Sequence, residues 1–295
     1  MSELVTSCPL CSSSASRLFD RRQFRERPVT NVICVGCGLV YQSPRMTAAE
    51  SQAFYESEYR LLYQGQAGPS PIDLSIQAAR ATVALDFIQN QVHTCSRHLD
   101  IGCSAGLILQ KFTGHYQSTA IGIEPGTSYR QYAQSQGLEV HASLEELEQS
   151  GLARFDLVTM MHVLEHLPDP VEYLRALGTR HLTQAGWLLL EVPNLYAHDS
   201  FEEAHLVSFS AHTLVQVVQK AGFKVIQLKT HGLPRSRLIP LYLSLLAQPD
   251  GITGSSPTPA RLVRLQRQLG FLRRRVITRL FPRQAWIEPV NMGGH

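Results

Sequence analysis

Between His98 and Leu228 the chain alternates short strand-like segments with longer segments of helical periodicity. Strand-like segments occupy residues 98–101, 120–124, 138–142, 156–160, 187–192 and 224–228. Helical spacing of apolar residues follows in segments 105–112, 128–136, 170–181 and 211–221. Because parallel strands need helical crossovers between them, this alternation predicts an α/β fold with a doubly wound, mostly parallel sheet.

The 295 residues, 44% of them apolar, can bury one sizeable core and a small accessory module. We expect four regions: a ribbon at 1–45, a helical linker or lid at 46–95, a ligand-binding core at 96–232, and an apolar segment, linker and basic amphipathic helical tail at 233–295. No segment is apolar and long enough to span a bilayer, and we find no signal-peptide pattern. These features favour a cytoplasmic protein.

Two Cys-x-x-Cys pairs lie near the N-terminus, Cys8 with Cys11 and Cys34 with Cys37. Each pair turns tightly enough to direct both sulfurs to one ion, and the spacer of roughly twenty residues suits a hairpin. We therefore expect a zinc ribbon, and its zinc is structural because four protein ligands leave no open position. The alternatives are unrelated cysteines or a redox pair.

Glycines and an acid follow the first two predicted strands. Strand 98–101 runs into the turn 102–106, Gly-Cys-Ser-Ala-Gly, and then into a helix whose first N–H groups can face a ligand. The second strand ends in Glu124, where a carboxylate can accept both hydroxyls of a ribose. The turn lacks the full G-x-G-x-x-G spacing, so the pattern favours a nucleoside without a pyrophosphate.

Longer motifs occur in a fixed order: LDIGCSAG, GIEPG, FDLVTMMHVLEHLPDP, LLLEVPN and EAHLVSFSAHTL. Their joint order, over about residues 8–230, resembles class I S-adenosylmethionine-dependent methyltransferases. With its N-terminal zinc ribbon, the chain is similar to the group of deoxysugar C-methyltransferases and methyltransferase-23-like proteins. The resemblance implies a Rossmann-like fold, methyl transfer, and S-adenosylmethionine as the cofactor of the core at 96–232.

The resemblance also assigns cofactor contacts residue by residue. Around the methionine part it places Asp100, Gly102, Cys103 and Gly106. At the ribose and adenine it places Glu124 with the adjoining Pro125, and Ser143, while Met161 or His162 would close the pocket.

Two rival motifs share these residues. Gly102-x-Ser104-x-Gly106 also spells the nucleophile elbow of α/β-hydrolases, with Asp199 and either His205 or His231 as triad partners. Against a hydrolase, the elbow would lie on the first strand, and Glu124 would have no role. The segment 162–166, His-Val-Leu-Glu-His, spells an inverted zinc-protease motif, but Pro168 would end any helix there early.

Histidines near strand ends are the candidate catalytic residues. His166 and His205 are the leading general bases, and His162 and Glu165 near His166 are further candidates. A base would raise the rate by about 10²–10⁴-fold if the acceptor loses a proton. Alternatively, Glu165, His166 and His205 resemble the divalent-metal set of small-RNA 2′-O-methyltransferases. This chain has His162 where that family has glutamate, and its histidine-rich set would favour zinc or iron over magnesium. A third interpretation is that these side chains only brace the loop.

The acceptor is expected to be a small hydroxylated metabolite or glycan precursor. The C-methyltransferases have Tyr-x-Glu-His where this chain has Glu202-Glu203-Ala204-His205, so only the histidine matches and O-methylation is favoured over C-methylation. A non-catalytic binding protein that keeps this fold is the alternative from another class.

The C-terminal segment 261–281 predicts a basic amphipathic helix. Eight arginines and no acids lie between Arg261 and Arg283, and one stripe carries Leu262, Leu265, Leu269, Leu272, Val276 and Leu280. The stripe could pack on the domain or a second subunit, or contact an anionic membrane peripherally. Nucleic acid is disfavoured because no aromatic stacking platform accompanies the arginines.

Overall fold

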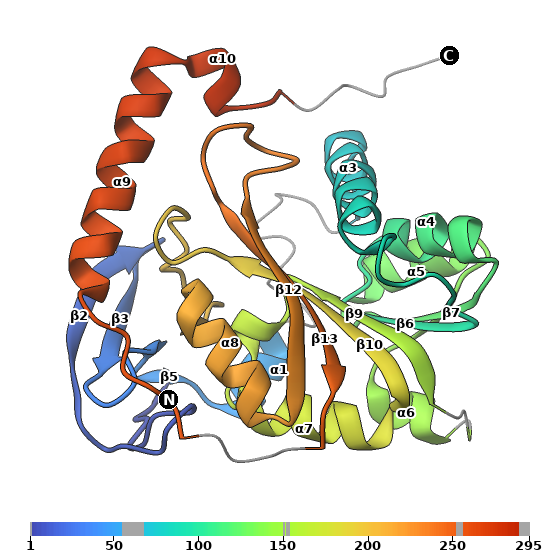
Figure 1. The fold of residues 1–295 in the computed structure, drawn as a ribbon, viewed down its shortest axis with the longest axis horizontal. Helices are drawn as coiled ribbons and strands as arrows, with labels where there is room; N and C mark the ends of the chain where they lie inside the picture. The colour runs from blue at the N-terminus through green and yellow to red at the C-terminus, as the bar shows by residue number, and fades with distance from the viewer. Residues whose placement is uncertain (1, 55–67, 150, 152–153, 252–255, 289–295) are drawn as a thin grey trace.

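The computed structural model describes residues 2–54, 68–149, 151, 154–251 and 256–288. Its centre is a seven-stranded sheet in the order β12-β13-β10-β9-β6-β7-β8 (Figure 1). The strands are Arg97–Ile101 (β6), Thr119–Ile123 (β7), Glu139–His141 (β8), Phe155–Met161 (β9), Leu182–Pro193 (β10), Phe223–His231 (β12) and Tyr242–Pro249 (β13). β8, β7, β6, β9 and β10 are parallel, whereas β13 is antiparallel to β10 and β12. The predicted mostly parallel α/β sheet is confirmed.

Helices cover both faces of the sheet (Figure 1). One face carries α3 (Pro71–Ile88), α4 (Leu107–Tyr116) and α5 (Thr127–Ser135); the other carries α7 (Pro170–Arg180) and α8 (Ala211–Lys220), and α6 (Leu144–Gln149) follows β8. Successive residues of β9 point to opposite faces, so Leu157 joins the core under α3 and α4, and Val158 joins the core under α7 and α8. The arrangement is doubly wound.

The sheet continues beyond the boundary that we expected at residue 232. The apolar segment after that residue is not outside the core: residues 242–249 form β13, between β10 and β12. Its side chains Leu243, Leu245 and Leu246 are buried on both faces of the sheet. A strand buried on both faces shows no polar alternation, which is why periodicity did not identify it.

The N-terminal residues form a hairpin-based module that shares a strand with the core. Its sheet comprises β2 (Ser16–Phe24), β3 (Arg27–Cys34), β4 (Val40–Gln42) and β11 (Val207–Ser208), in the order β11-β4-β3-β2. β1 (Ser2–Glu3) pairs with β5 (Arg45–Met46). Because β11 comes from residues 207–208 of the core region, the ribbon expected at 1–45 is joined to that region of the chain by backbone hydrogen bonds.

The segment expected as a helical linker contains α1 (Ala48–Ala53) and α3. α1 begins with a capping box between Thr47 and Glu50, and Ser70 caps α3 by accepting from the Asp73 N–H. Part of this prediction, residues 55–67, lies outside the described residues.

The C-terminal tail is helical, as predicted, with α9 (Val263–Leu280) followed by α10 (Pro282–Ala285). α9 stands along the edge of the N-terminal module (Figure 1). Its leucine stripe does not pack on the domain; Leu269 and Leu272 are each 56% exposed. Among the described residues, no helix is both long and apolar enough to cross a membrane.

Candidate functional site

A left-handed glycine turn follows β6. Gly102 has φ +74° and Gly106, the N-cap of α4, has φ +83°, a region that side chains disfavour. A Cβ on Gly102 would also lie 2.5 Å from Val163 Cγ2, so the backbone there must stay bare. The N–H groups of Gly102 and Cys103 both donate to the carbonyl of Ile123, which holds the turn against the end of β7.

Glu124 connects this turn to the next one. Its Oε2 accepts from the Ser104 N–H at 2.9 Å, and its Oε1 accepts from the Gly126 N–H at 2.9 Å. The side chain is buried, being only 4% exposed. A buried carboxylate at the carboxyl end of β7 is therefore fixed in place by backbone donors of both loops.

A cavity of about 770 Å³ opens at the carboxyl ends of β6, β7, β9 and β10. Such a volume suits a cofactor and a small second ligand. Most of the sequence-predicted site residues line it: Gly102, Cys103, Glu124, Pro125, Ser143, Met161, His162, His166 and His205. Asp100, Gly106 and Glu165 do not, so their predicted roles as direct contacts are not matched by the cavity wall.

Asp100 lies beneath the wall, inside the sheet. Its Oδ1 accepts from the Thr159 hydroxyl at 2.6 Å, and His98 Nε2 lies 2.9 Å from the same hydroxyl oxygen. Burial raises the pKa of Asp100 to about 7; the Thr159 hydrogen bond opposes this, and the Glu124 charge adds to it. Asp100 thus links β6 to β9 just before the glycine turn.

His166 and His205 face each other across the far end of the cavity, with ring centroids 4.8 Å apart. His166 lies in the single 3₁₀ turn η2 (Leu164–His166), and its Nδ1 is 2.9 Å from the Ala204 carbonyl. His205 Nδ1 is 3.0 Å from the Ser200 carbonyl. A carbonyl acceptor fixes a proton on Nδ1 of each ring. The Nε2 atom therefore accepts through its lone pair when the ring is neutral and donates its proton when the ring is charged.

The two histidines differ in basicity. Burial lowers the pKa of His166 to about 4, against the opposing charge of Glu165. Burial acts the same way on His205, but the hydrogen bond and charge of Glu202, whose Oε1 is 2.9 Å from Nε2, raise its pKa overall. At neutral pH the arrangement therefore favours a neutral His166 beside a more basic His205.

Glu165 lies directly behind these rings and is 1% exposed. Its Oε1 is 3.3 Å from His162 Nδ1, and its Oε2 accepts no hydrogen bond from any described residue. Burial would raise the pKa of Glu165, but the His162 hydrogen bond and the neighbouring histidine charges lower it to about 2. One oxygen of Glu165 and one nitrogen each of His166 and His205 lie within 4.8 Å of one another, as ligands of one ion would.

Gln42 is a site residue that sequence reasoning missed. From β4 of the N-terminal module, its Nε2 donates to the carbonyls of Glu202, Glu203 and His205 at 2.6–3.2 Å. The N-terminal module therefore holds the loop that carries His205. No local signal marks this glutamine, because its partners lie about 160 positions away.

A second missed cluster surrounds Glu191 at the end of β10. His162 Nε2, Arg80 Nε and His231 Nε2 lie 3.1–3.3 Å from its carboxylate, and the Ser244 hydroxyl donates to it at 3.0 Å. Burial would raise the pKa of Glu191, but the histidine hydrogen bonds and Arg80 lower it. Since His162 has φ +58° and contacts both Glu191 and Glu165, its ring is clamped between two carboxylates.

The hydrolase triad is not assembled. The carboxylate of Asp199 pairs with Arg22 and Arg267, and no ion pair joins it to His205 or His231. His205 bonds to Ser200 and Glu202, whereas His231 bonds to Ser244. The expected partners of Ser104 are therefore committed elsewhere, and the nucleophile interpretation is wrong on geometry.

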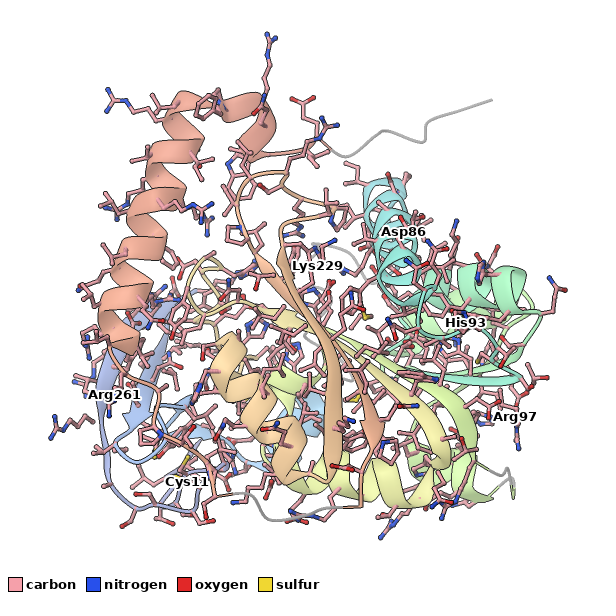
Figure 2. All side chains as sticks on the ribbon, in the orientation of Figure 1. Cys11, Asp86, His93, Arg97, Lys229 and Arg261 are labelled. Atoms are coloured by element: carbon pink, nitrogen blue, oxygen red, sulfur yellow. The ribbon has the colours of Figure 1, made fainter. Side chains whose placement is uncertain are left out.

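The four N-terminal cysteines converge as the sequence predicts. Cys8 Sγ lies 3.6 Å from Cys37 Sγ, and Cys11 Sγ lies 3.4 Å from Cys34 Sγ. All four offer sulfurs within 4.8 Å of one another. Hydrogen bonding from Cys37 lowers the pKa of Cys8 to about 5, and the same contact raises the pKa of Cys37. Figure 2 shows Cys11 at the opposite side of the view from Arg97, which begins β6.

A family model described as a methyltransferase domain matches residues 65–228, more than half of the chain. The chain belongs to this methyltransferase family, which confirms the resemblance seen in the motifs. Ubiquinone biosynthesis O-methyltransferases of Aeromonas salmonicida and Paracidovorax citrulli are 36% and 34% identical over 89 and 106 residues, or 28% and 33% of this chain. The matched stretches span 37% and 44% of those relatives, less than half of their length.

Solved structures show the same fold. The 1,6-didemethyltoxoflavin-N1-methyltransferase of Burkholderia thailandensis, with S-adenosylhomocysteine bound, superposes with a TM-score of 0.56 at 18% identity, covering 78% of this chain and 99% of that one. The magnesium protoporphyrin IX methyltransferase of Synechocystis, also with S-adenosylhomocysteine bound, has a TM-score of 0.50 at 12% identity, covering 69% and 100%. At these identities the likeness concerns the fold alone.

Proposed function

We propose that this protein is an S-adenosylmethionine-dependent methyltransferase that methylates a hydroxyl group of a small hydroxylated metabolite or glycan precursor. One observation carries the proposal: a single cavity joins the glycine turn and Glu124 at one end to His162, His166 and His205 at the other. The bound cofactor would supply a methyl group on a sulfonium. The sulfur leaves as a neutral thioether and needs no further activation. The protein's part is to align the acceptor with it, a proximity effect of about 7–11 kcal/mol.

The residues around the turn suit the cofactor. Gly102 admits backbone close to a ligand, Glu124 offers a fixed carboxylate to ribose hydroxyls, and Ser143 lies at the rim beyond β8. Cys103, Pro125 and Met161 add apolar wall. Asp100 and Gly106 shape this site from behind. The two solved relatives by fold hold S-adenosylhomocysteine, which supports the assignment.

His166 is the proposed general base. Burial keeps it neutral at physiological pH, and its Nδ1 proton is held by the Ala204 carbonyl, so Nε2 is the basic atom. A proton taken from an acceptor hydroxyl would go to that nitrogen. The charge of Glu165 would then stabilise the protonated His166 ring, and the His205 ring would fix its orientation by direct contact. His162, held between two carboxylates, would position the wall.

The acceptor end of the cavity is polar, which favours a hydroxylated ligand. Arg80, Arg235, His198 and Tyr242 line it. Among the described residues, His198 Nδ1 and the Tyr242 hydroxyl have no hydrogen-bond partner although they are buried. Buried polar atoms without partners are the groups that an acceptor's hydroxyls would satisfy. The O-methyltransferase names of the sequence relatives agree with an oxygen acceptor.

Screening a library of hydroxylated metabolites and nucleotide sugars with radiolabelled methyl donor tests the proposal. Label transferred to an oxygen supports it. Transfer to carbon would return the deoxysugar C-methyltransferase interpretation, and donor-product binding without any transfer would favour a binding protein. The location remains cytoplasmic in this proposal, because reduced cysteine pairs need a reducing compartment.

With an acceptor identified, His166→Ala is expected to lower kcat by about 10²–10⁴-fold while leaving the affinity for S-adenosylhomocysteine unchanged. The base acts only on the acceptor proton, so cofactor binding should not depend on it. Steady-state kinetics and calorimetric titration measure the two quantities. His93→Ala, at an exposed histidine between α3 and β6, is the matched control. A kcat within threefold of the wild type in His166→Ala would contradict the base.

The same end of the cavity supports a second candidate role, a divalent-metal site of Glu165, His166 and His205. Its distinctive observation is the buried Glu165 carboxylate, whose Oε2 has no donor among the described residues. Nitrogen-rich ligands would suit zinc or iron. Carbonyl acceptors on both Nδ1 atoms are also what metal-binding histidines use.

Elemental analysis separates the base from the metal. A metal here is expected to add one equivalent of zinc or iron per chain that Glu165→Gln removes. Glu145→Gln, at an exposed carboxylate on the rim of the cavity, should leave it in place. An identical metal content in Glu165→Gln and the wild type would exclude the metal role and leave the base.

A further inference from the structure

α9 presents its apolar stripe to solvent. Leu262, Leu265, Leu269, Leu272, Val276 and Leu280 are all exposed, by 46–69%. Helical spacing places the five residues from Leu265 to Leu280 on one face over nearly the whole length of α9, and Leu262 adjoins them as the N-cap residue. We call this face the outer stripe. Among the described residues, no side chain covers it. A contiguous exposed apolar surface of this kind is typical of a site that binds a partner or a membrane.

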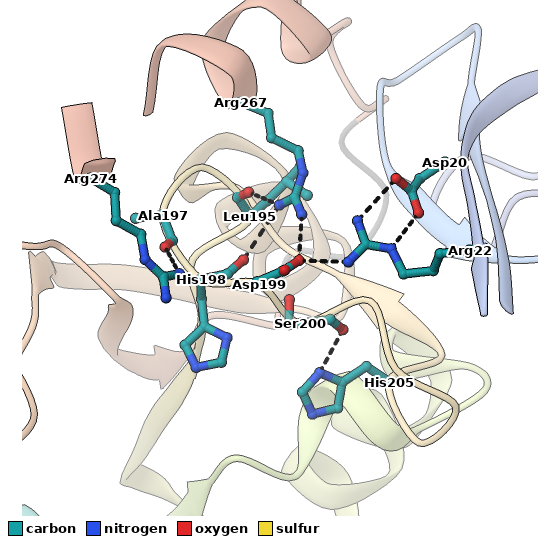
Figure 3. Close-up of polar contacts among 10 residues, drawn as sticks. All are labelled: Asp20, Arg22, Leu195, Ala197, His198, Asp199, Ser200, His205, Arg267 and Arg274. Atoms are coloured by element: carbon teal, nitrogen blue, oxygen red, sulfur yellow. Dashed lines mark hydrogen bonds and ion pairs between the residues drawn. The ribbon is translucent and has the colours of Figure 1, made fainter. Parts of the chain in front are cut away.

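The helix cannot turn this stripe inward, because its opposite face is occupied. Arg267 donates to the carbonyls of Leu195 and His198, and Arg274 donates to the carbonyl of Ala197 at 2.9 Å (Figure 3). Arg264 binds the carbonyls of Leu18 and Phe19 on β2 at 2.7 and 2.9 Å. These arginines therefore attach α9 to the loop 195–200 and to the N-terminal module.

Close packing reinforces this orientation. A Cβ on Gly270 would overlap the Tyr196 carbonyl, so the helix backbone rests directly on the loop. Arg267 also stacks over the Phe201 ring, 4.0 Å from its centroid, and Arg264 lies 4.9 Å over Phe19. The outward direction of the outer stripe is fixed by these contacts.

The exposed charges beside the outer stripe are all positive. Five arginines are exposed here: Arg261, Arg273, Arg275, Arg279 and Arg283. Within α9, helical spacing puts Arg273 on one flank of the outer stripe and Arg275 and Arg279 on the opposite flank. The sequence from 251 to 287 contains no Asp or Glu. Figure 2 shows long side chains projecting from the outward side of α9. Phe281 and Trp286 add exposed aromatic surface at the C-terminal end.

This charge pattern selects the partner. A second copy of α9 would bring arginines against arginines with no acid to pair them, which is unfavourable. Nucleic acid would meet a row of leucines where its phosphates need cations. An anionic lipid surface satisfies both features, since leucines enter the acyl boundary while flanking arginines reach the headgroups.

We propose that α9 binds an anionic membrane surface through the outer stripe, with the helix lying in the plane of the interface. Arg267 and Arg274 then connect the lipid-bound helix to the loop 195–200, whose His198 lines the cavity. The proposal is independent of which acceptor the enzyme takes.

Vesicle sedimentation tests this surface with the full-length protein. We expect the wild type to sediment with phosphatidylcholine vesicles containing phosphatidylglycerol, and to do so about tenfold less at high salt or with phosphatidylcholine alone. The double variant Leu269→Glu with Leu272→Glu should lower the lipid affinity by about tenfold or more, because it removes two leucines that would be buried in the lipid. Leu4→Glu, at a leucine 74% exposed in the N-terminal module, should leave it unchanged.

The folded state of each variant is checked by its thermal transition and by titration with S-adenosylhomocysteine, neither of which should change at exposed positions. Equal sedimentation with anionic and neutral vesicles, or with the wild type and the double variant, overturns the proposal. Light scattering that shows a lipid-free dimer lost in the double variant also overturns it, in favour of a second copy on the stripe.

Discussion

Freshly purified protein is expected to contain one zinc per chain at the N-terminal cysteines, and Cys34→Ser is expected to lose it. Four sulfurs with closest pairs 3.4 and 3.6 Å apart cannot all ionise unless a cation neutralises them. The small module around them has little core of its own, so the metal would supply folding free energy, about 10–16 kcal/mol in comparable sites. Elemental analysis after dialysis measures the content.

Loss of this zinc should also reach the active site. Gln42 on β4 holds the carbonyl of His205, and β4 pairs with β11 of the core, so unfolding of the ribbon releases the loop that carries His205. We expect Cys34→Ser to lower the thermal transition and to lose methyl transfer more than donor-product binding. Cys95→Ala, at a buried thiol whose pKa burial raises to about 12, is the control that should keep its zinc. Zinc-free wild type, or undiminished zinc in Cys34→Ser, would refute the site.

Sequence alone identified the features that depend on local pattern. The strands of the sheet from β6 to β10 and β12 have the period or composition of strands, and the turn at Gly102 needs a residue type that adopts positive φ. Because parallel strands end at one edge of a sheet, the glycine turn, Glu124 and the histidines could be placed near one another before any coordinates. The two Cys-x-x-Cys pairs converge for a different reason, because each pair turns tightly and the segment between them forms a hairpin.

Features that depend on distant partners could not be predicted. β13 is buried on both faces and has no alternation, so it was placed outside the sheet. Gln42 and Glu191 gain their roles from side chains and carbonyls of other elements. The orientation of α9 also depends on distant partners, because its amphipathic pattern allows the leucines to pack on the protein or to face outward. The carbonyls of the loop 195–200 decide this by binding its arginines. An apolar stripe shows which residues share one face of a helix, but it does not determine whether the rest of the fold covers that face.

Glu124→Ala is expected to weaken binding of S-adenosylhomocysteine by about 10²–10⁴-fold. In the proposed complex its carboxylate would accept two ribose hydroxyls, and charged hydrogen bonds contribute about 1.5–3 kcal/mol each. The substitution also removes the carboxylate that accepts from the Ser104 and Gly126 N–H groups beside the cavity. Both effects act in the same direction. Isothermal titration calorimetry measures the affinity directly.

Ser104→Ala separates the carboxylate from the turn around it. Ser104 contributes its backbone N–H to Glu124, and alanine keeps that donor, so the affinity should stay within about threefold of the wild type. Glu145→Ala removes an exposed carboxylate at the rim of the same cavity and controls for charge, since only a carboxylate fixed by both loops should matter. If Glu124→Ala bound the ligand as tightly as the wild type, the ribose would have to lie elsewhere. Glu124 would then only tie the two loops together.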